Sequence, residues 1–282
     1  MIKITAREEC HVVEMVDKGT IRLLSDLHID SKYTDNKKVK KLLDDAFKQG
    51  SLICIFGDLL DVMGGKYDKR TLKGDIKAEH NEDNYLNQVI EDAATLLAPY
   101  VDNLFISAGN HEKEIDKRFE LYLLEMLSDR IYRKTHKDLM WTKNYAGFML
   151  VNMKHSKRKA QMSKTIFYNH GKDSNAVMTF GTLNIKRNSS IIDADIFVSG
   201  HIHTNFLVPV NRLSLSQKRR IKVTEQLHVQ LGTAKETVGL DYFSAKKGFS
   251  PASTSFYDLT FVLKQDNHAI DYIDVTEQRI KL

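Results

Sequence analysis

Short apolar runs that alternate with longer, helix-compatible segments constrain the fold of this 282-residue chain more than any other feature. Apolar runs rich in β-formers predict strands at 21–26, 51–58, 103–110, 145–153, 164–169 and 194–199. Between them, helices are expected at 36–50, 83–97 and 112–129. After His203 the pattern predicts only strands, at 227–233, 254–263 and 269–275. Strands that alternate with helices predict a layered α/β architecture.

The composition is that of an ordinary soluble globular protein, with 42% hydrophobic and 28% charged residues. No run reaches the ~18 apolar residues of a membrane helix, and the N-terminus lacks a signal-peptide core. We therefore expect a cytoplasmic protein with no membrane partner. Cys10 and Cys54 are expected to be free thiols in a reducing compartment. No linker composition marks a boundary, so we expect one domain over 1–282.

Polar side chains follow five of the expected strands, at the point where each strand ends. In chain order these are Asp26 and His28; Asp58 and Asp61; Asn110, His111 and Glu112; His170; and His201 and His203. Residues two apart in an extended segment point the same way, so His201 and His203 would face one spot. The carboxyl ends of strands are where ligands bind in open α/β sheets.

Each cluster alone also has a purely structural interpretation. His170 could be a hydrogen-bonded core histidine, and GDLLD at 57–61 could be an ordinary turn with an aspartate that caps a helix. The pair His201 and His203 could be ligands or could bind nothing. Their joint occurrence, all at strand ends, favours one shared metal site.

The series DLH, GDLLD, GNHE, NHG and GHIH resembles the calcineurin-like metallophosphoesterases in motif order and spacing, over about residues 20–205. The resemblance implies a four-layer β-sandwich of two mixed sheets flanked by helices, with two metals at the sheet edge. It therefore replaces the single parallel sheet that the α/β pattern alone would suggest. The β-rich part 206–282 would complete the sandwich.

The resemblance also implies a set of metal ligands. Asp26, His28 and His203 would hold the first ion, Asn110, His170 and His201 the second, and Asp58 would bridge both. A carboxylate can span two ions ~3.5–4 Å apart, as two-metal hydrolysis requires. Imidazole, carboxylate and amide ligands without thiolate suit a pair of divalent ions, with Mn favoured and Fe, Zn or Ni as alternatives.

His111 and Asp61 are the expected catalytic residues. In the family, the histidine of GNHE faces the leaving group, and a histidine can protonate a departing alkoxide near pH 7. The resemblance suggests that Asp61 orients and charge-stabilises His111, although Asp61 could equally be a turn or capping aspartate. Glu112 is expected to support the site or to begin the following helix.

The resemblance implies a phosphoesterase that hydrolyses phosphodiester bonds by attack of a metal-bound hydroxide, most simply a nuclease on DNA or RNA. The net charge of +5 and pI near 8.9 permit a nucleic-acid partner. Basic runs at 154–159 and 217–222, the insertion 64–99 with Lys66, Lys69, Arg70 and Lys73, and aromatics at Tyr242, Phe243 and Phe249 could contact it or simply face water. The alternatives are a phosphodiesterase or phosphatase acting on small or cyclic nucleotides, and a catalytically silent metal-bound binding module. The sequence leaves the oligomeric state open.

Overall fold

The computed structural model describes residues 2–62, 77–80, 84–171, 182–215, 219–236, 252–266 and 271–282. The basic side chains of the insertion at 66–73, the aromatics at 242–249, and part of the run 217–222 lie outside these residues. Within the described chain, no helix is long and apolar enough to cross a membrane. Cys10 and Cys54 are both free thiols, and Cys54 is buried.

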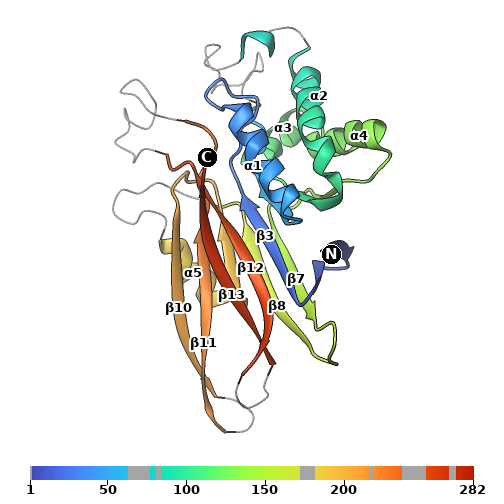
Figure 1. Ribbon diagram of the computed structural model, residues 1–282. Helices are drawn as coiled ribbons and strands as arrows, with labels where there is room; N and C mark the ends of the chain where they lie inside the picture. The colour runs from blue at the N-terminus through green and yellow to red at the C-terminus, as the bar shows by residue number, and fades with distance from the viewer. Residues whose placement is uncertain are drawn as a thin grey trace.

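Two mixed β-sheets face each other and form the centre of the structure (Figure 1). The six-stranded sheet has the order β13 (Asp271–Lys281), β12 (Ser255–Gln265), β3 (Lys18–Leu24), β4 (Leu52–Phe56), β5 (Leu104–Ser107) and β6 (Met140–Thr142). The seven-stranded sheet has the order β1 (Lys3–Arg7), β2 (Cys10–Val16), β7 (Ala146–Lys154), β8 (Gln161–Asn169), β9 (Ile196–Ser199), β11 (Ile221–Gln230) and β10 (Phe206–Leu215). This arrangement confirms the expected two-sheet fold.

Helices form the outer layers. The helices α1 (Asn36–Lys48), α2 (Tyr85–Leu97), α3 (Asn110–Phe119) and α4 (Leu123–Thr135) gather beside the six-stranded sheet, whereas α5 (Leu183–Ile191) lies by β9 and β11 of the other sheet (Figure 1). Short 3-10 turns occupy Ala78–His80 and Ala98–Asn103.

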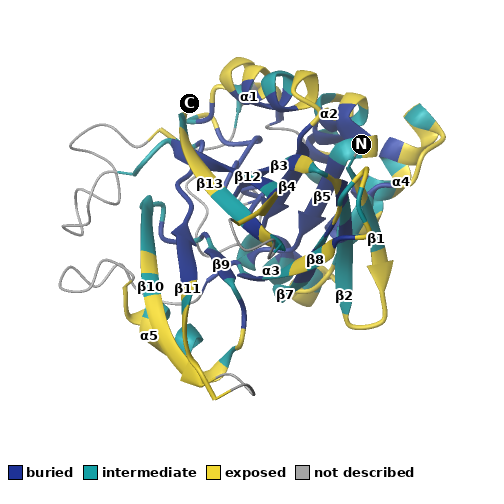
Figure 2. Ribbon diagram, turned by 60° about the horizontal axis from the view of Figure 1, so that its bottom comes forward, coloured by how far each residue is buried: buried dark blue, intermediate teal, exposed yellow. Residues whose placement is uncertain are grey.

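The apolar run at β4 is continuous because both faces of the strand are buried. Ile53 and Ile55 pack with the helices, whereas Cys54 and Phe56 pack in the core between the sheets. A strand with one wet face would alternate apolar and polar residues instead. Figure 2 shows the same contrast, with buried β3, β4 and β5 at the centre and exposed residues along β10 and β1.

The helix expected at 112–129 is wrong as a single element. The structure divides it into α3 and α4, because Glu120 adopts a left-handed backbone (φ 55°) and ends α3. The Asp116 carboxylate then accepts a hydrogen bond from the Leu123 amide at the start of α4. The break lets the two helices run in different directions. α3 begins at the GNHE motif, whereas α4 packs against α2.

Both basic runs lie at the opposite end of the sheets from the polar strand ends (Figure 1). The run 154–159 forms the turn between β7 and β8, and the described part of 217–222 lies at the turn between β10 and β11. His170 follows the far end of the nine-residue β8, so about 30 Å of strand separates it from the first turn.

Candidate metal centre

All five strand ends expected to carry ligands meet at one edge of the two sheets. β3, β4 and β5 run parallel and deliver the first three motifs, while β8 and β9 run parallel in the other sheet and deliver His170, His201 and His203. Five residues of these motifs have a left-handed backbone conformation, which only a few percent of non-glycine residues adopt. The five are Asp26, His28, Asp58, His201 and His203, with φ between 42° and 70°. Such strain, of order 1–3 kcal/mol per residue, concentrates at functional sites.

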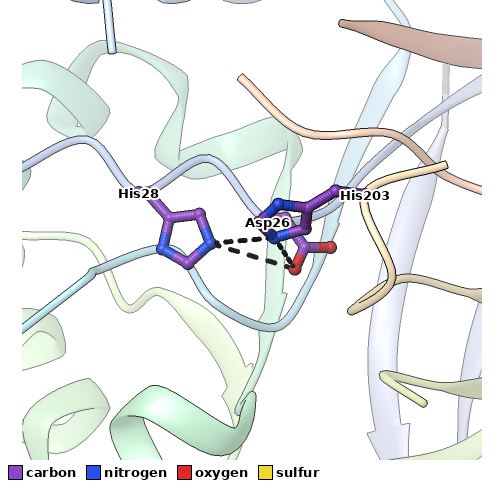
Figure 3. Close-up of side chains that lie close together, drawn as sticks. All are labelled: Asp26, His28 and His203. Atoms are coloured by element: carbon purple, nitrogen blue, oxygen red, sulfur yellow. Dashed lines mark hydrogen bonds and ion pairs between the residues drawn. The ribbon is translucent and has the colours of Figure 1, made fainter. Parts of the chain in front are cut away.

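Asp26, His28 and His203 form the first cluster (Figure 3). The Nε2 atoms of the two histidines lie 3.4 Å apart, and His203 Nε2 lies 3.3 Å from Asp26 Oδ1. His28 Nε2 lies 3.9 Å from the same oxygen. The other Asp26 oxygen accepts hydrogen bonds from the Ser25 hydroxyl (2.6 Å) and the His201 amide (2.8 Å), which fixes the carboxylate.

Asp58, His170 and His201 form the second cluster. His170 Nε2 lies 3.1 Å from Asp58 Oδ2 and 3.1 Å from Asn110 Oδ1, so the amide expected as a ligand faces the same place. His170 Nδ1 is 2.8 Å from the carbonyl oxygen of Phe56. A metal-binding histidine ordinarily uses its second ring nitrogen in this way, which leaves Nε2 available to an ion.

The buried Asp26 Oδ1 provides a test of whether a cation fits. This atom has no hydrogen-bond partner within the described residues, yet three imidazole Nε2 atoms, from His28, His170 and His203, lie 3.3–3.9 Å from it. Unpaired buried carboxylate oxygens are costly, and imidazole nitrogens that face one another repel when both carry lone pairs or protons. A divalent cation in each cluster would satisfy both groups, so the residues fit a dinuclear site.

The electrostatics without a cation show how strongly these groups interact. Burial alone would raise the pKa of Asp58, but the neighbouring His170 and His111 hold this pKa well below its usual range. Burial alone would lower the pKa of His170, but Asp58 and Asp26 raise it to about 10. The site therefore stabilises positive charge next to its carboxylates.

His111 lies beside both clusters on the first turn of α3. Its Nδ1 is 2.6 Å from the backbone oxygen of Asp61 and 3.5 Å from the Asp61 carboxylate. Asp61 was expected to orient His111, and the shortest contact between the two residues is with the Asp61 backbone oxygen, not with its carboxylate. The Asp61 carboxylate lies closer to His28, with 3.3 Å between Oδ1 and Nδ1. His111 Nε2 lies 3.7 Å from Asp58 Oδ2 and so faces the metal centre.

Two buried carboxylates that hold the loops in place have roles that the sequence reasoning missed or left open. Glu112 accepts hydrogen bonds from the amides of Asp58 (3.2 Å), Leu60 (3.0 Å) and Gly109 (2.8 Å). Asp30 accepts from the amides of Asp61 (2.5 Å) and Val62 (2.9 Å). Asp30 stands two residues after His28, and this position next to the DLH motif was the sequence signal that could have indicated its role.

Small residues allow this close packing. A side chain at Gly57, where φ is +85°, would place a Cβ atom 2.4 Å from His170 Nδ1. At Gly109 the same atom would lie 2.1 Å from Asp58 Oδ1. Both distances are far shorter than any real contact, so the glycines of GDLLD and GNHE are steric requirements of the site.

Residues 19–205 match the family model of the calcineurin-like phosphoesterases, and the chain belongs to that family. No curated protein sequence matches the chain. Among solved structures, it is similar to Vps29 from Chaetomium thermophilum, at 13% identity over 93% of this chain and 97% of that one, with a TM-score of 0.35. A predicted phosphoesterase from Streptococcus pneumoniae has 12% identity over 93% and 98% of the two chains (TM-score 0.33). GAP50 of Plasmodium, described as an anchor in the inner membrane complex, has 11% identity over 94% and 84% (TM-score 0.45).

Proposed function

We propose that this chain is a phosphodiester hydrolase that uses two divalent metal ions. Manganese is the favoured metal for both ions. The observation that carries the proposal is the convergence of the two side-chain clusters at one buried sheet edge, beside His111. Bound ions of this kind activate water and offset the negative charge of a phosphate. The family supplies the reaction class, since its members are phosphoesterases.

The chain's own residues would divide the work as follows. Asp26, His28 and His203 would hold one ion, Asn110, His170 and His201 the other, and Asp58 would be shared between them. His111 would protonate the departing oxygen. Its Nδ1–H donates a hydrogen bond to the Asp61 carbonyl oxygen at 2.6 Å, so Nε2 faces the site and can carry the transferred proton.

We propose nucleic acid as the substrate class. The net charge of +5 supports it, because a polynucleotide is a polyanion. The basic turn at 154–159 lies about 30 Å along β8 from His170, so only a polymeric substrate is long enough to contact both. Arg158 already pairs with Asp271 at 2.7 Å, which leaves Lys157 and Lys159 for such contacts.

The distance of the basic turns from the site favours a second candidate, hydrolysis of small or cyclic nucleotides. A small substrate at the sheet edge reaches neither turn, and then the basic runs have no part in catalysis.

A substrate panel with Mn²⁺ separates these functions. It should contain bis-p-nitrophenyl phosphate, p-nitrophenyl phosphate, single- and double-stranded DNA, RNA and cyclic nucleotides, with the Asp58→Asn variant as the control for contaminating activity. We expect cleavage of the diester and of a polynucleotide. Activity confined to small nucleotides would move the second candidate to first place. Absence of hydrolysis despite bound metal would indicate a silent binding module.

Charge reversal of Lys157 and Lys159 tests the polynucleotide contact. It should lower kcat/KM on DNA or RNA and flatten its salt dependence, because fewer condensed counterions are released. Hydrolysis of bis-p-nitrophenyl phosphate should be unchanged. Equal salt dependence in the variant and the wild type would exclude the turn as a contact.

A further inference from the structure

Of the residues that the structure describes, Lys235 is the one charged residue at this site that comes from outside the stretch matched by the family model, which ends at residue 205. Its Nζ lies 2.6 Å from Asp61 Oδ2, and the two side chains are only 14% and 6% exposed. Among the described residues, it is the only side chain whose hydrogen bond reaches the Asp61 carboxylate within 3 Å. This ion pair therefore sets the direction of that carboxylate.

The backbone of Asp61 is held by other groups. Its amide donates to Asp30, and its carbonyl oxygen contacts His111 Nδ1. Neither contact fixes the side chain. Removal of Lys235 would leave a buried carboxylate without its compensating charge, beside two imidazoles, with its rotamer undetermined.

The carboxylate in turn contacts two site histidines. Asp61 Oδ1 lies 3.3 Å from His28 Nδ1 and 3.5 Å from His111 Nδ1. A proton on Nδ1 of His28 leaves Nε2 as the lone-pair nitrogen, which is the atom that faces Asp26 and His203. A carboxylate that accepts a hydrogen bond from the Nδ1–H of a metal-binding histidine orients the ring and selects the tautomer. Asp61 Oδ1 and His28 Nδ1 are both buried, have no other hydrogen-bond partner among the described residues, and lie close enough for that role.

The main chain around Lys235 fixes its position. After β11, the Thr233 hydroxyl donates to the Asp26 carbonyl oxygen (2.6 Å), and the Ala234 amide donates to the same oxygen (3.0 Å). The Glu236 amide donates to the Tyr33 carbonyl oxygen (2.9 Å). The segment 233–236 is thus hydrogen-bonded to the loop that carries Asp26 and His28, and Lys235 reaches from it to the loop that carries Asp61.

We propose that Lys235 is a positioning residue that holds the Asp61 carboxylate against His28, and so directs the Nε2 atom of His28 toward the metal centre. The proposal rests on the proposed function, since it takes His28 as a metal ligand. It assigns a role in the site to the C-terminal part of the chain.

The experiment compares Lys235→Met and Lys235→Arg with the wild type. The matched control is Lys38→Met, which removes a cation from the neighbouring exposed ion pair with Glu236 (2.5 Å). Titration calorimetry of the metal-free proteins with Mn²⁺ should show about 10- to 100-fold weaker binding of one ion in Lys235→Met, the usual effect of losing such a support. Lys235→Arg should restore most of the affinity, and Lys38→Met should match the wild type.

The link through Asp61 is tested by a double-mutant cycle. Once Asp61→Asn has removed the carboxylate charge, Lys235→Met should weaken Mn²⁺ binding little further. Two fully additive losses would overturn the proposal. So would wild-type affinity for both ions in Lys235→Met, or a change confined to KM, which would place Lys235 on the substrate.

Imidazole ¹⁵N NMR of the metal-free proteins separates failure of this proposal from failure of the proposed function. The wild type should show the Nδ1–H form of His28, and Lys235→Met should show a mixture of tautomers or a mobile ring. If the wild type bound no Mn²⁺, the proposed function would fail, and the NMR comparison would still decide the role of Lys235. Identical His28 spectra in both proteins would overturn it.

Discussion

Replacement of His111 by alanine tests the chemistry of the proposed site most directly, because this side chain faces the metal centre and is in neither of the two clusters proposed to hold ions. With His28 and Asp61 it forms a third close group, so metal analysis of the variant is part of the test. General acid catalysis by a positioned side chain contributes about 10²- to 10⁴-fold in rate. That range corresponds to roughly 3–5 kcal/mol of transition-state stabilisation. The upper part of the range is expected here, because the contact with the Asp61 carbonyl oxygen at 2.6 Å orients the ring.

The assay compares two phosphodiesters whose leaving groups differ in basicity, such as a nitrophenolate and an alkoxide, at saturating Mn²⁺. A nitrophenolate departs without protonation, so His111→Ala should lose most of its rate on the alkyl ester and much less on the aryl ester. His111→Gln keeps polarity and approximate size without the transferable proton and serves as the matched variant. Metal analysis of each protein shows whether both ions remain bound.

Equal losses on the good and the poor leaving group would refute the argument, because they would mean that His111 positions substrate or metal. Loss of a bound ion in His111→Ala would have the same consequence. In either case the proton donor would have to be sought elsewhere in the site.

Three further predictions concern the ligands and the fold. Asp58→Asn should lower activity at least as much as any other ligand change and reduce bound Mn²⁺, because two cations would lose a shared negative charge; two ions at wild-type affinity by metal analysis would exclude the bridging role. Arg22→Met should lower the free energy of unfolding by about 3–5 kcal/mol, because it leaves the buried Asp258 carboxylate unpaired. In the wild type this carboxylate lies 2.7 Å from the Arg22 guanidinium. Urea denaturation measures the loss, and a loss below about 1 kcal/mol would contradict the prediction. Burial lowers the pKa of His228 to about 4, so the unfolded chain binds a proton there first as the pH falls. Stability should therefore decline from about pH 6.5 to pH 4, by up to about 3 kcal/mol, and the decline should be smaller by that amount in His228→Phe; parallel stability curves for the two proteins would refute the assignment.

The positions of most elements near the site could be predicted because apolar pattern and strand burial are coupled. β4 is buried on both faces, so its five residues are all apolar and the run is easily recognised. β1, β2, β6, β10 and α5 were not predicted. β10 is largely exposed beyond Val208 and α5 buries no residue, so neither carries a strong apolar period.

The helix at 112–129 failed for a related reason. Apolar spacing continues from α3 into α4, but the left-handed backbone of Glu120 interrupts it. Glutamate rarely adopts that conformation, so no residue type announced the break. Packing of Leu123, Leu124 and Leu127 against the other helices stabilises the second direction.

The sequence by itself determined the candidate metal centre, because a metal site needs particular side chains and here they stand at strand ends. Asp26, Asp58, Asn110 and His170 follow separate strands, and the parallel strands of each sheet bring their carboxyl ends to one edge. Gly57 and Gly109 are visible in the motifs, but the space that requires them is set by tertiary contacts with His170 and Asp58.

Only the tertiary structure decided what surrounds that centre. Lys235 lies 174 residues from Asp61 along the chain, and no motif or spacing connects the two. Their contact exists because β11 pairs with β9, which brings segment 233–236 against the loop after β3. The basic turns show the same dependence. Their charge is evident in the sequence, but the length and direction of β8 and β11 place them at the end of the sheets far from the candidate metal centre. Long-range strand pairing fixes these relations, and a local pattern carries no information about it.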